Sequence, residues 1–208
     1  MDTLHDWIDD MDIQYAIESR DKKIFIRDIK LKMVVIENNI SLIKTRFEFK
    51  DNRKHYQKLV EEFASVGIVC GSFSLFVHGL IDRPPKDIDL LVDRHSEVIK
   101  SFIKRNEKRI NQFRCDKKSS FNNVVDSFEP VEQFKTKDIM VDMFHDIDVK
   151  FIEYNGIKVQ CPFQVIQKKI DIYDEVSRTK DLDDLKLISK RLDVIIEAQE
   201  DRLGIDIR

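Results

Sequence analysis

The chain has 208 residues, of which 36% are charged and 42% are hydrophobic, with only 5 Gly and 4 Pro. This composition excludes collagen-like, linker-like and disordered chains, and it favours a helix-rich globular protein. Lys and Arg (36) nearly balance Asp and Glu (39), so the net charge of −3 does not by itself indicate nucleic-acid binding. No run of about 18 apolar residues is present and the first residues are acidic, so we expect a cytoplasmic protein with no membrane partner.

The first third of the chain predicts helices. Between Ile13 and Phe63 there is no proline, and apolar residues recur every three or four positions, as on one face of a helix. The spacing predicts two or three helices here, the last over residues 54–64. At residues 67–70 the pattern changes to a short apolar run, which predicts a strand that ends at Gly71.

A short helix, a turn and a second strand follow. The helix is predicted over residues 73–78 and ends at Gly79, because glycine tolerates the left-handed conformation found after many helices. Pro84-Pro85 excludes helix, and residues 87–92 alternate between acidic and apolar before becoming wholly apolar, as in a partly buried strand. Residues 96–113 return to a helical pattern.

The second half of the chain begins with a polar stretch. Residues 114–137 show no clear periodicity, and one short strand is expected at Val124-Val125. Strands are predicted over residues 139–144 and 149–152, followed by a hairpin turn at residues 154–157. Strands therefore continue to about residue 160.

After Cys161 the pattern is helical to near Leu203. The order of helices, mixed strands and further helices predicts an α+β fold, with a small mixed sheet flanked by N-terminal and C-terminal helices. We expect an N-terminal helical extension at residues 1–60, a core at residues 61–160 and a helical segment at residues 161–208 that packs on the core.

Asp87 and Asp89 are the most informative residues in the sequence. On a strand, residues two positions apart face the same side, so both carboxylates project together. A divalent cation between them relieves their repulsion, and such oxygen ligands suit Mg²⁺ or Mn²⁺ when substrate phosphates complete the coordination. An isolated Asp-x-Asp pair also arises by chance on a solvated strand face, so the neighbouring motifs decide its meaning.

Two other motifs support a metal site that handles phosphate. Gly71-Ser72 lies between a strand and a helix, where backbone N–H groups and a hydroxyl can hold a phosphate. Asp142 lies in an apolar strand, where an acid is costly to bury unless it is paired or binds a metal; the alternative is an edge-strand acid that faces water. Together, Asp87, Asp89 and Asp142 fit a two-metal site for phosphoryl transfer.

Metal binding through sulfur is not expected. Cys70, Cys115 and Cys161 form no C-x-x-C pair and have no histidine at zinc spacing. An odd number of scattered cysteines is typical of reduced thiols.

The motifs in the middle and at the end of the chain resemble a known family. They comprise Gly71-Ser72, Gly79, Arg83, the segment Lys86-Asp87-Ile88-Asp89-Leu90-Leu91-Val92, and Asp142 on a later strand. This pattern resembles the signature of the DNA polymerase β-type nucleotidyltransferase superfamily. The C-terminal stretch is similar to an element of the AbiEii-type toxins and the lincosamide/aminoglycoside-type nucleotidyltransferases. This stretch contains Lys168-Lys169 followed by Arg178-Thr179-Lys180-Asp181-Leu182-Asp183-Asp184-Leu185. The resemblance spans roughly residues 66–187.

The resemblance implies a metal-binding role for the strand acids. Asp87 and Asp89 would bind the metal ions, Mg²⁺ or Mn²⁺. Asp142 would complete the metal site or take the proton of an acceptor hydroxyl, and Asp146 and Asp148 are alternatives for this third acid.

The resemblance also implies a set of nucleotide-binding residues, namely Gly71, Ser72, Lys169, Arg178, Asp181 and Asp184. The glycine and the serine would hold the triphosphate of an NTP donor. The two cations would neutralise phosphate charge, with Lys168 as the alternative to Lys169. The two acids of this set, three residues apart on a helix, would help to close the site.

The implied activity is transfer of an NMP from an NTP to an acceptor hydroxyl, with release of pyrophosphate. An AbiEii-like toxin that acts on tRNA, another RNA or a protein, with a cognate antitoxin as partner, competes with an antibiotic-type enzyme that acts on a small-molecule hydroxyl. A third alternative is an inactive nucleotidyltransferase fold that serves as a binding or regulatory module. Lys100, Lys104 and Lys108 share one predicted helix face, which would steer a polyanion or simply be solvated.

Overall fold

The computed structural model describes residues 4–37, 60–83, 85–109, 130–135, 140–146, 148–154 and 156–203. The chain divides into two compact units. The helical unit comprises Met1–Leu42 and Ile170–Arg208, and the sheet unit comprises Ile43–Lys169. The three-part division expected from the sequence stays a prediction.

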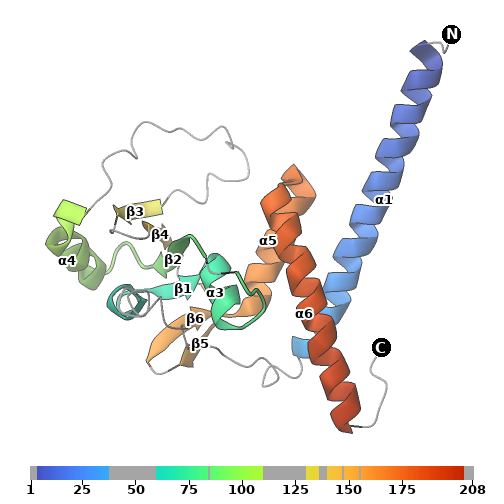
Figure 1. Cartoon of the computed structure of the whole chain (residues 1–208). Helices are drawn as coiled ribbons and strands as arrows, with labels where there is room; N and C mark the ends of the chain where they lie inside the picture. The colour runs from blue at the N-terminus through green and yellow to red at the C-terminus, as the bar shows by residue number, and fades with distance from the viewer. Residues whose placement is uncertain are drawn as a thin grey trace. The chain divides into compact units, whose positions relative to one another are not determined.

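The described part of the sheet unit contains a six-stranded mixed sheet with the strand order β3-β4-β2-β1-β6-β5 (Figure 1). Its strands are β1 (Ile68–Cys70), β2 (Asp87–Val92), β3 (Pro130–Lys135), β4 (Met140–His145), β5 (Phe151–Tyr154) and β6 (Ile157–Gln160). β2 is parallel to β4 and β1 is parallel to β6, whereas the other three neighbouring pairs are antiparallel. The predicted α+β class is therefore confirmed.

Helices precede, connect and follow these strands. They are α1 (Leu4–Glu37), α3 (Gly71–Val77), α4 (Glu97–Arg105), the short 3-10 turn η3 (Glu107–Arg109), α5 (Pro162–Val176) and α6 (Thr179–Leu203). α1 is one continuous helix within the region where two or three helices were predicted, and it begins before the proline-free stretch that starts at Ile13. The predicted C-terminal helix is divided into α5 and α6 near Ser177, whose φ of 50° interrupts regular helical geometry.

Alternation along the central strands separates an apolar face of the sheet from an acidic one. On β2, Ile88, Leu90 and Val92 are buried, whereas Asp87 and Asp89 alternate with them and are only partly buried. β4 repeats this pattern, because its Val141 and Met143 are fully buried. A strand with period-two alternation places its acids and its core residues on opposite faces.

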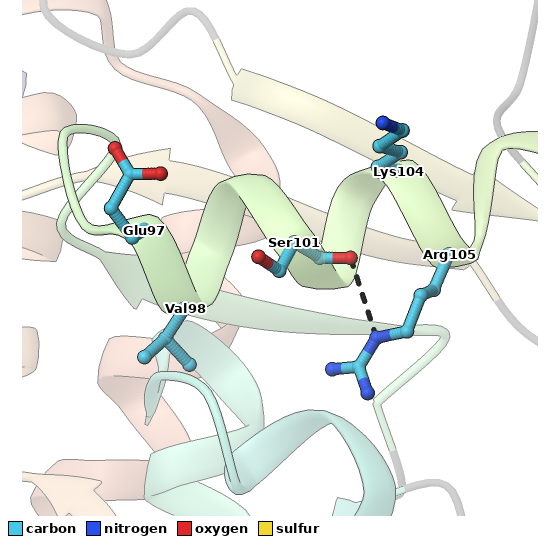
Figure 2. Close-up of a pocket in the computed structure, with 5 residues that line it drawn as sticks. All are labelled: Glu97, Val98, Ser101, Lys104 and Arg105. Carbon is cyan, nitrogen blue, oxygen red and sulfur yellow. Dashed lines mark hydrogen bonds between the residues drawn. The ribbon is translucent and has the colours of Figure 1, made fainter.

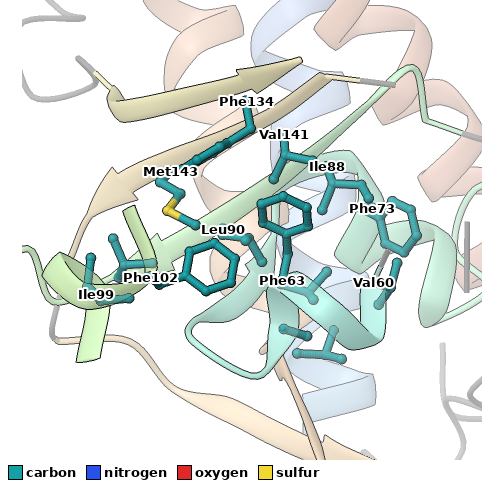
Figure 3. Close-up of a cluster of buried hydrophobic side chains, with 14 of the residues drawn as sticks. Val60, Phe63, Phe73, Ile88, Leu90, Ile99, Phe102, Phe134, Val141 and Met143 are labelled. Atoms are coloured by element: carbon teal, nitrogen blue, oxygen red, sulfur yellow. The ribbon is translucent and has the colours of Figure 1, made fainter. Parts of the chain in front are cut away.

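The apolar face of the sheet packs against helical residues 60–64, α3 and α4 (Figure 3). The ring of Phe63 lies 5.4 Å from that of Phe102 and 5.5 Å from that of Phe134, between centroids. Aromatic contacts at this spacing add to the burial of their apolar area. This core holds β2, β3 and β4 in register.

Two sequence predictions in this region differ from the structure. β3 was not predicted, because Phe134 is its one fully buried side chain among the described ones and the segment lacks a clear apolar alternation. The strand expected at residues 149–152 begins later, at Phe151, while the predicted hairpin is confirmed by the antiparallel pairing of β5 with β6. The strand expected at Val124-Val125 lies outside the described residues.

In the helical unit, α1 and α6 run in the same direction. Lys22 donates to the Ser177 hydroxyl (3.1 Å), and ten residues later Lys32 binds Asp193 (2.9 Å between Nζ and Oδ1). Ile29, between these two lysines, and Ile36, one turn after Lys32, are fully buried. Among the described residues, no helix is long and apolar enough to cross a membrane.

We expect Phe134→Ala to destabilise the sheet unit by about 3–5 kcal/mol, since it removes a fully buried ring and leaves a cavity. Phe151→Ala is the matched control, because Phe151 is 44% exposed and its ring contacts the Lys158 ammonium. The control should lose about 1 kcal/mol or less. Denaturant unfolding of both variants tests this difference, and equal losses would contradict the packing described above.

Candidate metal centre

Three carboxylates converge on the acidic face of the sheet. Asp87 and Asp89 lie on β2 and Asp142 lies on β4, and the parallel pairing places Asp89 directly opposite Asp142. One side-chain oxygen from each acid lies within 4.8 Å of the others. The sequence places the first two acids together, and the register of β2 with β4 adds the third.

This acid trio, Asp87, Asp89 and Asp142, has the chemistry of a metal site. All three side chains are partly buried, so their mutual repulsion is less well screened than it would be in bulk water. A cation that binds the three carboxylates would relieve this repulsion, and a set of oxygen ligands without sulfur or imidazole suits a hard divalent ion. The trio can therefore hold a metal ion.

The two alternatives for the third acid do not join the trio. Asp146 and Asp148 are exposed beyond the end of β4, and the oxygens that cluster among the described residues are those of Asp142. Asp142 lies between the buried Val141 and Met143 on β4, and its pairing with Asp89 gives the two acids the same face of the sheet.

Gly71 is the first residue of α3, and its backbone lies against the Asp89 carboxylate of the trio. Its φ is +59°, a conformation that favours glycine, and an added Cβ would overlap the Asp89 carboxylate. The backbone at Gly71 thus lies directly against a metal-ligand candidate. Ser72, the next residue of the predicted phosphate-binding motif, is largely buried in the first turn of α3.

The thiol of Cys70 lies on the other side of Asp89. Cys70 is the β1 partner of Asp89. Burial raises the pKa of this thiol well above its usual range, and the Asp89 carboxylate raises it further. With no metal bound, Cys70 is therefore a neutral thiol beside the acids.

Lys168 on α5 interacts electrostatically with nearby acids. Partial burial lowers the pKa of Lys168, while Asp146 and Asp89 act in the opposite direction. The sequence left Lys168 and Lys169 open as the phosphate-binding cation. Lys168 interacts electrostatically with Asp89, whereas the Lys169 side chain is buried, with 7% of its surface exposed.

Gln133 is a residue of the site that the sequence analysis missed. It lies opposite Asp142 on β3, and its Nε2 donates to Asp142 Oδ1 at 2.6 Å. This bond fixes one oxygen of Asp142 and orients the carboxylate. No sequence signal pointed to Gln133, because β3 itself was not predicted.

The remaining predicted site residues belong to the helical unit. Arg178 donates through Nε to Asp181 Oδ2, and this contact raises the pKa of the guanidinium. The side chains of Asp181 and Asp184 are fully buried at the start of α6. Their part in nucleotide binding, and that of Lys169, stays a prediction.

A shallow hollow lies elsewhere in the sheet unit, along α4 (Figure 2). Its lining comes from Glu97, Val98, Ser101, Lys104 and Arg105, and it includes none of the trio. Lys104 and Arg105 project from opposite sides of the helix, and the Arg105 Nε donates back to the Ser101 carbonyl (3.3 Å). Lys100 pairs with Glu97 at 2.6 Å, so part of the predicted basic face is neutralised locally.

Comparisons with known proteins identify no relative of this chain. No family model matches it, and neither the curated proteins nor the solved structures contain a match. The resemblance to nucleotidyltransferases therefore rests on the motifs quoted above.

We expect Gly71→Ala to weaken Mn²⁺ binding at the trio by about tenfold or more, because its Cβ displaces the Asp89 carboxylate. Gly156→Ala is the matched control: Gly156 also has a positive φ, of 80°, but nothing lies within 4 Å of its added Cβ. Both variants should lose about 1–2 kcal/mol of stability from the unfavourable φ. Electron paramagnetic resonance of Mn²⁺ should detect a binding defect in the first variant alone.

The raised pKa of Cys70 predicts low reactivity. A raised pKa leaves little thiolate at neutral pH, so iodoacetamide should modify the partly exposed Cys161 well before Cys70. Mass spectrometry of digests taken over time tests this order, and unfolding in urea should make both thiols reactive. Equal rates in the folded protein would contradict the burial of Cys70.

Proposed function

We propose that this protein is a metal-dependent nucleotidyltransferase that moves an NMP from an NTP to an acceptor hydroxyl. The observation that carries the proposal is the acid trio on the adjacent parallel strands β2 and β4, with the backbone of Gly71 against Asp89. A carboxylate cluster beside a strand-to-helix turn suits a triphosphate bound through a metal.

The donor atoms fit Mg²⁺ or Mn²⁺. Asp87, Asp89 and Asp142 offer carboxylate oxygens alone. When bound there, such an ion supplies positive charge for the phosphates and for the developing charge of the transition state. The three acids would hold it from one face of the sheet.

The chain's own residues then bind and orient the reactants. The ammonium of Lys168 interacts electrostatically with Asp89, and it would neutralise phosphate charge near the trio. Gln133 donates to one oxygen of Asp142 and so orients this carboxylate within the trio. Neither residue needs to change its charge during the reaction, so both act by positioning and electrostatics.

The bonds made and broken are those of an in-line displacement at phosphorus. The acceptor hydroxyl oxygen forms a bond to the α-phosphorus while the bond from that phosphorus to the α–β bridging oxygen breaks. Pyrophosphate leaves with that oxygen, and the hydroxyl proton passes to water or to a neighbouring carboxylate. Positioning by the trio, Gly71 and Lys168 accounts for the protein's contribution.

We expect Mg²⁺ together with at least one of the four NTPs to raise the melting temperature of the protein. A ligand at about 100 times its dissociation constant stabilises a fold by roughly 2.7 kcal/mol, which a thermal-shift titration detects readily. The double variant Asp87→Asn/Asp89→Asn should lose this shift, because it removes two of the three negative charges of the trio.

Asp201→Asn is the matched control, since it makes the same chemical change at an exposed position on α6. It should keep the shift of the wild type. Release of pyrophosphate from the responding NTP, in the presence of candidate hydroxyl acceptors, then measures the reaction itself. Binding of no NTP, or an equal shift in the double variant, would reject the nucleotidyltransferase proposal and favour a non-catalytic binding module.

A further inference from the structure

His78 is a buried histidine at the end of α3 that the proposed function does not use. It is the C-cap residue of the helix, and only 2% of its surface is exposed. Its backbone N–H donates to the Ser74 carbonyl (2.9 Å), so His78 completes the last turn of α3. Histidine changes its charge near neutral pH, so a buried histidine makes the packing around it depend on pH.

The ring of His78 is held between α3 and the sheet. Its Nε2 donates to the main-chain carbonyl of Gln160 on β6 (3.1 Å), because a carbonyl oxygen can only accept. The Ser74 hydroxyl, one turn earlier on α3, donates to the same carbonyl (2.8 Å). The ring also contacts that of Tyr154 on β5, with 5.8 Å between centroids. Two donors on one carbonyl therefore fasten the end of α3 to β6.

The other ring nitrogen of His78, Nδ1, is buried and forms no hydrogen bond with the described part of the chain. The neutral ring with its proton on Nε2 has its single N–H satisfied by the Gln160 carbonyl. The imidazolium carries a second N–H at Nδ1, which would be a buried donor with no acceptor and would bring a buried positive charge. The surroundings of His78 thus suit the neutral ring and oppose the cation.

No neighbouring charge compensates for this. The titratable residues of the elements around α3 and of the chain that follows it are Glu61, Glu62, Cys70, Asp82, Arg83, Asp87, Asp89, Glu153, Tyr154 and Lys158. Burial lowers the pKa of His78, and the hydrogen bond to the Gln160 carbonyl acts in the opposite direction. Neither cause is a charged side chain, so the balance is decided by burial.

We propose that His78 forms a pH-sensitive contact between α3 and β6, in which the neutral ring holds the end of α3 on the sheet and uptake of a proton releases it. α3 has seven residues and starts with Gly71, whose backbone lies against the Asp89 carboxylate. Acidification therefore loosens a helix that borders the candidate metal centre. The contact depends on the packing of the sheet unit and not on the proposed function.

The direction of the pH dependence follows from burial. The unfolded chain binds a proton at His78 near the ordinary histidine pKa of about 6.5, whereas the folded chain binds it only at lower pH. The stability is therefore complete above about pH 6.5 and is lost as the pH falls below this value. Because one proton is involved, the equilibrium constant of unfolding rises by at most about tenfold for each pH unit.

Unfolding of the full chain in urea at about pH 7.5 and at about pH 5.5 tests this dependence. His78→Gln keeps an amide N–H for the Gln160 carbonyl but cannot take up a proton. Between the two pH values, the unfolding constant of the wild type should rise more than that of the variant, by several-fold and at most about tenfold. His95→Gln is the matched control, because His95 is exposed, and it should keep the pH dependence of the wild type.

Hydrogen–deuterium exchange distinguishes a local release of α3 from unfolding of the whole sheet. At about pH 5.5, and after correction for intrinsic rates, the wild-type amides at the end of α3 should exchange several-fold faster than those of β2. His78→Gln should slow the α3 amides toward the β2 rate. Equal exchange of α3 and β2 in the wild type would contradict a local release.

Nuclear magnetic resonance of the wild type with labelled histidines measures the protonation of His78 directly and requires no variant to fold. Its signals can be identified through the contact with the Tyr154 ring. His78 should stay in the neutral form with the proton on Nε2 at pH values where a histidine in water is already charged. Protonation of His78 in the folded chain at about pH 6.5, or equal pH dependence of the wild type and His78→Gln in urea, would overturn the proposal.

Discussion

The parallel register of β2 with β4 is the constraint on which the candidate site depends. It sets Asp89 directly opposite Asp142 and brings three carboxylates within 4.8 Å, an arrangement that mutual repulsion opposes. The apolar face of the same strands holds the register, since Ile88, Leu90, Val141 and Met143 are fully buried on it. A slip of one residue would exchange these faces, so the core and the site are specified together.

The acid trio is part of a longer polar row across four strands. Gln133, Asp142, Asp89 and Cys70 are successive register partners on β3, β4, β2 and β1. Their charges are confined to the middle of the row, because Gln133 is neutral and burial keeps the Cys70 thiol protonated. Lys168 provides positive charge nearby, and Gly71 leaves room for the Asp89 carboxylate. A hard cation is the ligand that this distribution of charge suits best.

In both units, the repeat of the secondary structure decides which side chains share a face. In the sheet unit, period-two alternation separates a core from a row of acids. In the helical unit, α1 buries Ile29 and Ile36 on one face and exposes Ile24 and Leu31 on another, so one helix carries two apolar stripes.

The sequence by itself determined the α+β class, the strand that carries Asp87 and Asp89, and their shared face, because these follow from local alternation and spacing. Asp142 was identified as an acid in an apolar strand, but only the pairing of β2 with β4 decided that it, rather than Asp146 or Asp148, completes the trio. The bond from Gln133 to Asp142 and the electrostatic interaction of Lys168 with Asp89 depend on tertiary structure alone. Strand order and helix placement join residues far apart in the chain, and no local pattern encodes which strands become neighbours.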